Sequence, residues 1–324
     1  MRVGLCASPG SVLTSTFASP RAENRSLTPH LAGAPNFRRV DGLPVYGVAI
    51  TTADGMRAVL EAVGGVSRPV LWHSMREEPL TYVNGQPYVL REVERPFSNL
   101  ELTGVSGERV EAMEARLAVD VQAEAAAYGG RLLVSAELDD GRVTEQWVTV
   151  ESVQTPASLA ASLAAEGYPL SYVRIPITDE KAPKGRDCDA IATRCAAASA
   201  DTALIFNCQM GRGRTTTAMV VATLVTLRLH PGSDTAVPVA VPQLLPDAPD
   251  AALLRGDYAV IRSLLRVVEN GREAKAAADA AIDRCSAMQN LREAVLTYRR
   301  GLNHEADEKR REAALARGVE YLER

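Results

Sequence analysis

Hydrophobic and polar residues alternate along most of this 324-residue chain in patterns typical of short strands and amphipathic helices. The segments predicted as strands are Val45–Ile50, Val70–His73, Leu80–Val83, Pro87–Arg91, Arg131–Leu138, Arg142–Val150, Tyr172–Ile177 and Thr202–Phe206. The segments predicted as helices are Met56–Val63, Ser106–Tyr128, Thr155–Gly167, Asp187–Ala200 and Thr215–Leu229. Because strands and helices alternate, we expect an α/β fold in which a central sheet is flanked by helices.

Two local patterns sharpen this picture. Asn84-Gly85 lies between two predicted strands, and Asn-Gly is typical of a tight hairpin because both residues tolerate positive φ. The helix predicted over Ser106–Tyr128 has apolar residues at spacings of three and four, namely Val110, Met113, Leu117 and Val121. We therefore expect a hairpin at the first position and one buried stripe on the helix.

The two ends of the chain and one internal segment differ in composition from the rest. Residues 1–35 are rich in Ser, Ala, Pro and Thr, which predicts a disordered leader. Residues 36–300 are predicted to form the folded domain, with an N-terminal subregion at 36–98 and a core at 99–300. Within the core, residues 231–250 lack periodicity and predict a mobile loop. Residues 301–324 are charge-rich and predict a C-terminal helix that is solvated or binds a partner.

Three further helices are predicted between the mobile loop and the charged tail. They cover Tyr258–Val268, Arg272–Met288 and Leu291–Arg300. Their apolar positions suggest that they pack on the sheet.

Charge and cysteine content exclude several classes of function. A net charge of −4 argues against a nucleic-acid-binding protein held by bulk charge. No stretch approaches the roughly 20 apolar residues of a membrane span, so we expect no integral membrane association. The five cysteines show no spacing typical of a metal site or a disulfide framework. We therefore expect a protein of the reducing cytoplasm that holds no metal or cofactor.

The segment with the most informative chemistry is Cys208-Gln209-Met210-Gly211-Arg212-Gly213-Arg214-Thr215. It lies between a predicted strand and a predicted helix, where backbone N–H groups and a helix N-terminus can form a cradle for an anion. Such a cradle would hold Cys208 as a thiolate, and Arg214 could grip two phosphate oxygens with its planar fork. The pattern Cys-x5-Arg-Thr is typical of phosphatases that pass a phosphoryl group through cysteine.

The other residues of this segment have expected roles as well. Thr215 offers a hydroxyl that could hydrogen-bond the thiolate and ease its departure from a phosphocysteine. The residues expected to bind phosphate are Gln209, Met210, Gly211, Arg212 and Gly213, in which the glycines allow a tight turn. If its side chain faces outward, Arg212 would favour a substrate with several phosphates.

Phosphoryl transfer through cysteine also needs a general acid to protonate the leaving oxygen. Asp179 follows the strand that ends at Ile177, and would lie near Cys208 if the two strands are parallel neighbours. It could later activate water against the phosphocysteine, although a cap for the next turn is an alternative role. Lys181 and Lys184 on the same loop could form a basic rim, or could be solvated surface charges.

Several segments together resemble one known family. The loop Phe206–Thr216 resembles the phosphate loop of paladin and of the cysteine phytase-like phosphatases. The other similar segments are Asn36–Val40, Gly42–Gly47, Arg76–Pro79, Tyr82–Arg91, Thr178–Pro183 and Asn290–Val295. The resemblance covers residues 36–300 and implies a protein tyrosine phosphatase-like α/β fold. By matching position it makes Cys208 the nucleophile, Arg214 the phosphate clamp and Asp179 the acid.

The same resemblance implies inositol phosphates such as phytate, or phosphoinositides, as substrates. The sequence therefore favours a cytoplasmic cysteine phosphatase that hydrolyses phosphomonoesters of a polyanion through a phosphocysteine intermediate. The acid loop lacks the Trp-Pro-Asp form of typical tyrosine phosphatases, so a weakly active or inactive paladin-like scaffold is one alternative. A protein tyrosine or dual-specificity phosphatase is another. A rhodanese-like sulfurtransferase fits Arg214-Thr215 and Asp179 poorly.

Overall fold

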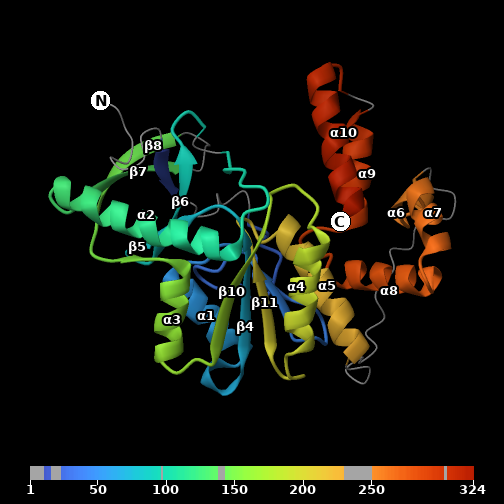
Figure 1. The fold of residues 1–324 in the computed structure, drawn as a ribbon, viewed down its shortest axis with the longest axis horizontal. Helices are drawn as coiled ribbons and strands as arrows, with labels where there is room; N and C mark the ends of the chain where they lie inside the picture. Colours follow the sequence, from blue (N-terminus) through green and yellow to red (C-terminus); the bar gives the residue numbers. More distant parts are fainter. Residues whose placement is uncertain (1–10, 16–22, 96–97, 138–142, 230–249, 303–304) are drawn as a thin grey trace. The chain divides into compact units, whose positions relative to one another are not determined.

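The computed structural model describes residues 11–15, 23–95, 98–137, 143–229, 250–302 and 305–324 (Figure 1). The chain divides into two compact units, each built from several segments. Unit 1 comprises Met1–Arg38, Tyr46–Asp179 and Asp201–Thr215, and unit 2 comprises Arg39–Val45, Glu180–Ala200 and Thr216–Arg324. The predicted domain at 36–300, with its internal boundary after residue 98, does not coincide with this division.

A five-stranded sheet of order β10-β4-β11-β3-β2 forms the framework that carries the candidate site. Its strands are β2 (Arg38–Arg39), β3 (Val45–Val48), β4 (Val70–Arg76), β10 (Leu170–Ile177) and β11 (Ala203–Asn207). Strand β4 pairs in parallel with both β10 and β11. The strands before Asp179 and Cys208 are therefore parallel but not neighbours, because β4 lies between them. All three strands nevertheless end at the same edge of the sheet.

Two helices of unit 1 pack on this sheet through apolar stripes (Figure 1). They are α1 (Ala53–Val63) and α3 (Pro156–Ala165), and a short 3-10 turn, Gly65–Ser67, follows α1. The buried residues that the helices contribute are Met56, Val59, Leu60, Val63, Leu159, Ala160 and Leu163. These side chains form one cluster with Val70, Trp72 and Ile205 of the sheet. The predicted α/β fold with a helix-flanked sheet is confirmed.

A second sheet has six strands in the order β8-β7-β1-β6-β5-β9, and the sequence pattern did not separate it from the first. Its strands are β1 (Ser11–Ser15), β5 (Leu80–Val83), β6 (Gln86–Glu92), β7 (Arg131–Glu137), β8 (Val143–Thr149) and β9 (Val153–Gln154). Asn84 and Gly85 join β5 and β6 with φ values of 51° and 75°, which confirms the predicted hairpin. Helix α2 (Gly107–Ala127) covers this sheet with Leu117 and Val121.

Strand β1 corrects the prediction that residues 1–35 form a disordered leader. Ser11–Ser15 pair antiparallel with β6 and parallel with β7. Leu13 is 1% exposed and packs in the core of the six-stranded sheet, so this segment adds apolar surface as well as backbone hydrogen bonds. Residues 1–10 and 16–22 of the leader, and residues 231–249 of the predicted mobile loop, lie outside the described residues.

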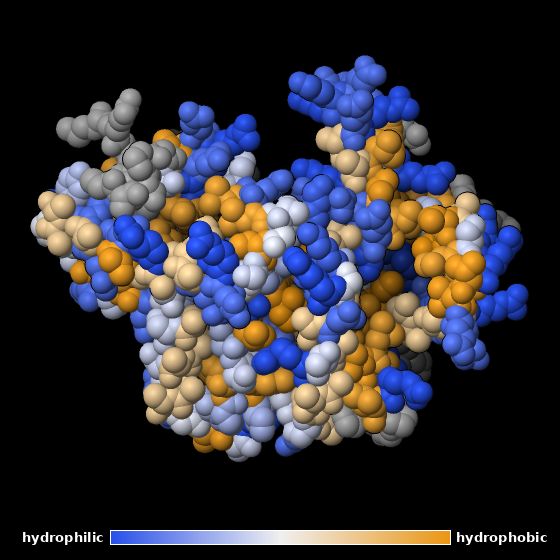
Figure 2. Space-filling view, in the orientation of Figure 1, coloured by the Kyte–Doolittle hydropathy of each residue, from blue (hydrophilic) through white to orange (hydrophobic). Residues whose placement is uncertain are grey.

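Unit 2 is mainly helical. Its helices are α4 (Gly185–Ala196), α6 (Ala251–Leu254), α7 (Ala259–Val267), α8 (Gly271–Arg284), α9 (Leu291–Leu302) and α10 (Glu308–Glu323), and α5 (Gly213–Leu229) runs from unit 1 into unit 2. None of the residues of α7, all of which are described, is buried. Val260, Leu264 and Val267 are exposed. Figure 2 shows hydrophobic surface, coloured orange, in the region of α6 and α7. These apolar positions of α7 are therefore not part of a buried core.

Thr52 illustrates how a local interaction stabilises unit 1, because its Oγ1 accepts a hydrogen bond from the Gly55 amide at 2.9 Å and caps α1. Thr52→Ala should lower the free energy of unfolding by about 1 kcal/mol, whereas Thr52→Ser keeps the hydroxyl and should lose less. The two tryptophans, Trp72 and Trp147, both belong to unit 1, so urea unfolding followed by tryptophan fluorescence reports on this unit. Equal losses in both variants would show that the hydroxyl does not stabilise the helix.

Candidate active site

The loop Cys208–Arg212, which we call the phosphate loop, joins the end of β11 to the start of α5, as the sequence predicts. Cys208 is buried, with 3% of its surface exposed. The loop is held by two hydrogen bonds to its carbonyl groups. The Ile50 amide donates to the Gln209 carbonyl at 3.1 Å, and Asn36 Nδ2 donates to the Met210 carbonyl at 2.9 Å. These bonds fix the backbone of the loop against neighbouring segments of unit 1.

Gly211 lies where the loop approaches the end of β3. Its φ is +65°, a conformation that other residues rarely adopt. A Cβ at this position would lie 2.6 Å from the Ala49 nitrogen and 2.7 Å from the Val48 carbonyl oxygen. Both the backbone angle and the available space therefore require glycine, which explains one of the two glycines in the motif.

Arg214 is 2% exposed, and its guanidinium is held along one edge. Nη1 donates to both carboxylate oxygens of Glu78, at 3.0 and 3.1 Å, and to the Ile177 carbonyl at 3.1 Å. Among the residues that the structure describes, Nη2 has no hydrogen-bond partner, and Nε lies at ion-pair distance, 3.2 Å, from Asp179 Oδ1. The edge formed by Nε and Nη2 is thus the one that can grip two oxygens of an anion.

Glu78 is fully buried between two arginines. Besides its bonds to Arg214, its Oε2 lies 3.3 Å from Arg76 Nη2. Burial alone would raise the pKa of Glu78, but the charges of Arg214 and Arg76 outweigh it and lower the pKa to about 2. In the same way, burial opposes the charge of Arg214, and Glu78 and Asp179 outweigh that cost and raise its pKa. The Glu78–Arg214 pair is therefore ionised throughout the neutral range.

Arg76 links this buried pair to the phosphate loop. Its guanidinium donates from Nη1 to the side-chain oxygen of Gln209, and its own exposure is 0%. Burial is the main influence on Arg76 and lowers its pKa. Arg76 therefore connects the buried pair to Gln209, the second residue of the loop.

A second buried ion pair, between Arg174 and Glu114, contacts the backbone of Arg76. Arg174 donates from Nη1 to the Arg76 carbonyl at 3.1 Å and pairs through Nη2 with Glu114 at 2.6 Å. Burial raises the pKa of Glu114 to about 7, although the charge of Arg174 opposes this shift. Glu114 lies on α2, where the apolar periodicity had predicted Met113 as the buried residue; Met113 is only half-buried.

Asp179 contacts Arg214, so the structure brings together the acid and the clamp that the sequence predicts. Its Oδ1 lies 3.2 Å from Arg214 Nε, and its Oδ2 accepts a hydrogen bond from Asn99 Nδ2 at 2.6 Å. The side chain is 40% exposed, which leaves it accessible to a bound molecule. Arg214 and Asp179 are therefore in direct contact in unit 1, and Cys208 begins the loop that leads to Arg214.

The remaining residues predicted for the site differ in their surroundings. Thr215 is fully buried, and its Oγ1 has no hydrogen-bond partner within the described part of the chain. Gly213 begins α5, Arg212 is exposed, and Met210 is 39% exposed. Lys181 and Lys184 belong to unit 2 rather than to unit 1. Lys181 forms an ion pair with Glu320 at 3.2 Å, so one of the two positive charges expected at the rim is already paired.

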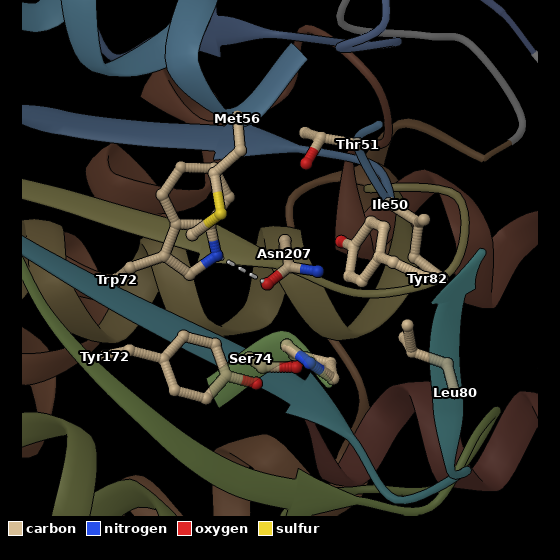
Figure 3. A pocket seen from close by; sticks show the side chains of 10 residues that line it. Ile50, Thr51, Met56, Trp72, Ser74, Leu80, Tyr82, Tyr172 and Asn207 are labelled. Carbon is tan, nitrogen blue, oxygen red and sulfur yellow. Dashed lines mark hydrogen bonds between the residues drawn. The ribbon is translucent and has the colours of Figure 1, made fainter. Parts of the chain in front are cut away.

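A small pocket in unit 1 reaches Asn207, the residue before Cys208 (Figure 3). It is lined by Ile50, Thr51, Met56, Trp72, Ser74, Leu80, Tyr82, Pro156, Tyr172 and Asn207. Trp72 Nε1 donates to Asn207 Oδ1 at 2.9 Å, as the dashed line in Figure 3 shows. A volume of about 20 Å³ has room for one water molecule and excludes a sugar phosphate. The hydrogen bond from Trp72 holds the side chain of Asn207 at the end of β11.

Comparison with known proteins places the chain in a family. The family model of protein tyrosine phosphatase-like phytases, with the description inositol hexakisphosphate, matches residues 73–226. Paladin from Gallus gallus is 31% identical over 301 residues, which are 89% of this chain and 33% of that protein. Paladin from Homo sapiens is 31% identical over 328 residues, which are 97% of this chain and 35% of that protein. The chain belongs to the paladin and protein tyrosine phosphatase-like phytase family.

The chain spans about a third of the length of these curated paladins. Among solved structures, a tandemly repeated protein tyrosine phosphatase-like phytase from Mitsuokella multacida is similar over 68% of this chain and 38% of that chain, with 21% identity and a TM-score of 0.49. A myo-inositol phosphatase of the same organism, in complex with myo-inositol-(1,3,4,5)-tetrakisphosphate, is similar over 68% and 37%, with 21% identity and a TM-score of 0.48. The range that matches the family model includes Glu78, Asp179, Cys208 and Arg214.

Within the described residues, no group of three or more His, Cys, Asp and Glu side chains is arranged to hold a metal ion. Over the same ranges, no helix combines the length and apolar character needed to cross a bilayer. The described cysteines, Cys188, Cys195, Cys208 and Cys285, form no disulfide bonds with one another.

The sequence analysis assigned no role to Arg76 and Glu78, whose side chains hold Arg214 and Gln209 in place. Arg76 and Glu78 lie within a segment that carried the resemblance, yet Glu78 is 136 residues from Arg214 and no local pattern links the two. One signal was present, because Arg76-Glu77-Glu78 places three charged residues directly after an apolar strand. Charges at the end of a buried strand indicate either a surface turn or a buried ion pair, and the structure decides for the second.

Glu78 and its neighbour Glu77 offer a matched test of the buried pair. Glu77 is 1% exposed and accepts hydrogen bonds from the Leu102 amide and from Thr178, and burial raises its pKa. Glu78→Gln should lower the free energy of unfolding by about 3–5 kcal/mol, because it leaves buried arginines without their counter-charge. Glu77→Gln should cost only about 1–3 kcal/mol, the range for a lost buried hydrogen bond.

The stabilisation that Glu78 provides should depend on pH. The pKa of Glu78 is about 2 in the folded protein and its ordinary value is 4.5. Its stabilisation is therefore complete above the ordinary value and is lost as the pH falls toward 2. Denaturant unfolding at neutral pH and in acid should show the difference between wild type and Glu78→Gln becoming smaller in acid. A difference that is constant with pH would contradict an ionised Glu78.

Proposed function

We propose that this protein is a cysteine-dependent phosphatase that removes phosphate from a polyanionic phosphomonoester, such as an inositol phosphate or a phosphoinositide. One observation carries the proposal. Arg214 is bound along one edge by Glu78 while its other edge faces Asp179, and the buried Cys208 begins the loop that leads to Arg214. The inositol hexakisphosphate description of the matching family model supports a substrate with several phosphates.

In the proposed first step, the Cys208 sulfur attacks phosphorus in line with the leaving oxygen. The S–P bond forms as the P–O bond breaks, and Asp179 gives its proton to the leaving oxygen. Arg214 and the loop amides stabilise the charge on the equatorial oxygens. In the second step, water attacks the phosphocysteine and gives its proton to Asp179. The S–P bond then breaks, and Thr215 hydrogen-bonds the departing thiolate.

Two further features belong to the proposal. Arg212 is exposed on the phosphate loop, where it can contact a second phosphate of the same substrate. A nucleophilic thiol must stay reduced, so we place the protein in the cytoplasm.

The second candidate is a paladin-like scaffold that binds phosphate without turnover. The observation that favours it is the engagement of both Asp179 oxygens, one by Arg214 and the other by Asn99. In that arrangement each carboxylate oxygen of Asp179 already has a partner, so neither is free to protonate a leaving group. Turnover requires the carboxyl to leave Arg214 when the phosphoryl group arrives, whereas a scaffold needs no such movement.

Asp179→Asn separates the two functions. For an inositol phosphate the variant should lower kcat by about 10²–10⁴, the usual contribution of general acid catalysis. For p-nitrophenyl phosphate the loss should be smaller, because nitrophenolate leaves without a proton. Initial rates of phosphate release would measure both. Absence of release by the wild-type protein would favour the scaffold, and equal losses on the two substrates would show that Asp179 is not the acid.

Arg212→Ala should distinguish substrates by their charge. Losing a charge-assisted hydrogen bond of about 1.5–3 kcal/mol should lower kcat/KM for inositol hexakisphosphate by roughly 10–100-fold. An aryl monophosphate should be hardly affected, because it has no second phosphate. Arg116→Ala, which removes a 75%-exposed arginine from α2 of the same unit, is the control for the loss of one charge. Equal effects of Arg212→Ala on both substrates would contradict a role in recognising polyanions.

A further inference from the structure

Helix α10 contacts the segment Glu180–Ala182, which follows Asp179 directly in the chain. Glu320 of this helix accepts a hydrogen bond from the Ala182 amide at 2.8 Å through Oε2. Through Oε1 it accepts a second from Lys181 Nζ at 3.2 Å. All of these residues except Asp179 belong to unit 2. One of the two sequence-based expectations was that the charged C-terminal helix is solvated. These hydrogen bonds show that it also contacts another segment of the protein.

Arg317 of the same helix and Arg324, which follows the helix, reinforce the contact. Arg317 Nε lies 2.9 Å from Glu180 Oε2, and Arg324 Nε donates to the Lys181 carbonyl at 3.2 Å. Each residue of Glu180–Ala182 thus has a backbone or side-chain atom bound to the end of α10. The segment and the helix each contribute one acidic and at least one basic side chain to these contacts. This arrangement fixes the direction of the segment as well as its distance from the helix.

Helix α10 is itself anchored, so it can act as a fixed support. Tyr321 is 9% exposed, and its ring stacks on Tyr298 of α9 with centroids 5.4 Å apart. Gln289 Nε2 donates to the Tyr321 hydroxyl at 3.1 Å. The two helices lie side by side, as the red segment of Figure 1 shows. Glu320 is the neighbour of this packed tyrosine in the sequence, and its backbone is accordingly held in place.

The backbone at Glu180 explains why the segment needs support. Its φ is +58°, in the left-handed region that residues other than glycine rarely adopt. Such a conformation persists where the surrounding structure holds it. Here Arg317 holds the Glu180 side chain and Glu320 holds the amide two residues further on. Because one peptide bond joins Glu180 to Asp179, relaxation of this bend would turn the Asp179 carboxyl.

We propose that Glu320 is a positioning residue for Asp179, acting through its hydrogen bonds to Ala182 and Lys181. The inference rests on the proposed function, in which Asp179 is the general acid. It assigns the C-terminal helix to the acid step of the reaction and Lys181 to a structural contact instead of the substrate rim. Small displacements of a reacting group are costly in rate, so loosening the segment should slow the step that uses Asp179.

The test compares Glu320→Ala with Glu312→Ala, which removes an exposed glutamate from the same helix. Glu320→Ala in the full chain should lower kcat for inositol hexakisphosphate by about 10-fold and leave KM nearly unchanged. The loss with p-nitrophenyl phosphate should be clearly smaller, because that leaving group does not need the proton. Glu320→Gln keeps an oxygen that can accept from Ala182 and should retain most of the activity, and Glu312→Ala should behave as wild type.

Hydrogen exchange gives a readout that does not depend on turnover. The amides of residues 178–184 should exchange about 10-fold faster in Glu320→Ala, because the Ala182 amide loses its acceptor, and should be unchanged in Glu312→Ala. In the Asp179→Asn background, Glu320→Ala should cause no further loss of kcat, since both changes act on one step. Additive losses, equal losses on the two substrates, or unchanged exchange would overturn the proposal.

The same experiments separate the positioning role from the proposed function. Absence of turnover in the wild-type protein would contradict the phosphatase function and the positioning role together. Turnover that depends on Asp179 but is insensitive to Glu320→Ala would contradict the positioning role alone.

Discussion

The candidate site depends on the ion pair between Glu78 and Arg214. A guanidinium can be buried only where a counter-charge compensates for the loss of water, and Glu78 supplies that charge with both of its oxygens. The pair also divides the guanidinium into two edges. Nη1 binds Glu78 and the Ile177 carbonyl, Nε lies 3.2 Å from Asp179 Oδ1, and Nη2 has no hydrogen-bond partner among the described residues. Because the pair is shielded from water, a phosphate held on the second edge would interact strongly with it.

The five-stranded sheet delivers one member of the site at the end of each of three strands. Asp179 follows β10, Glu78 follows β4 and Cys208 follows β11, and these strands are consecutive in the order β10-β4-β11. Glu78 therefore follows the middle of the three strands. From there it contacts Arg214, which lies in the chain after β11 and in turn contacts Asp179 after β10. Parallel strands commonly place ligand sites at this edge, and here the edge also carries the buried charges.

The sequence was sufficient for the parts of this arrangement that are local. The phosphate loop, the hairpin at Asn84 and the clustering of Asp179 with Arg214 follow from patterns within a few residues or from strand direction. Glu78 was missed because its partner is 136 residues away, and Glu114 was missed because apolar periodicity does not report a buried charge. Strand β1 and the contact of α10 with Glu180–Ala182 both depend on tertiary pairing. The composition of residues 1–35 and 301–324 does not reveal such pairing.

The central claim of this account is that Cys208 carries the phosphoryl group. The most direct measurement is a rapid denaturing quench during turnover of an inositol phosphate, followed by mass spectrometry of the peptide that contains Cys208. The account predicts a phosphoryl group on Cys208 while substrate is being consumed, and none in the Cys208→Ser variant or before substrate is added. Release of phosphate without any phosphorylated Cys208, or with the phosphoryl group on another side chain, would contradict it.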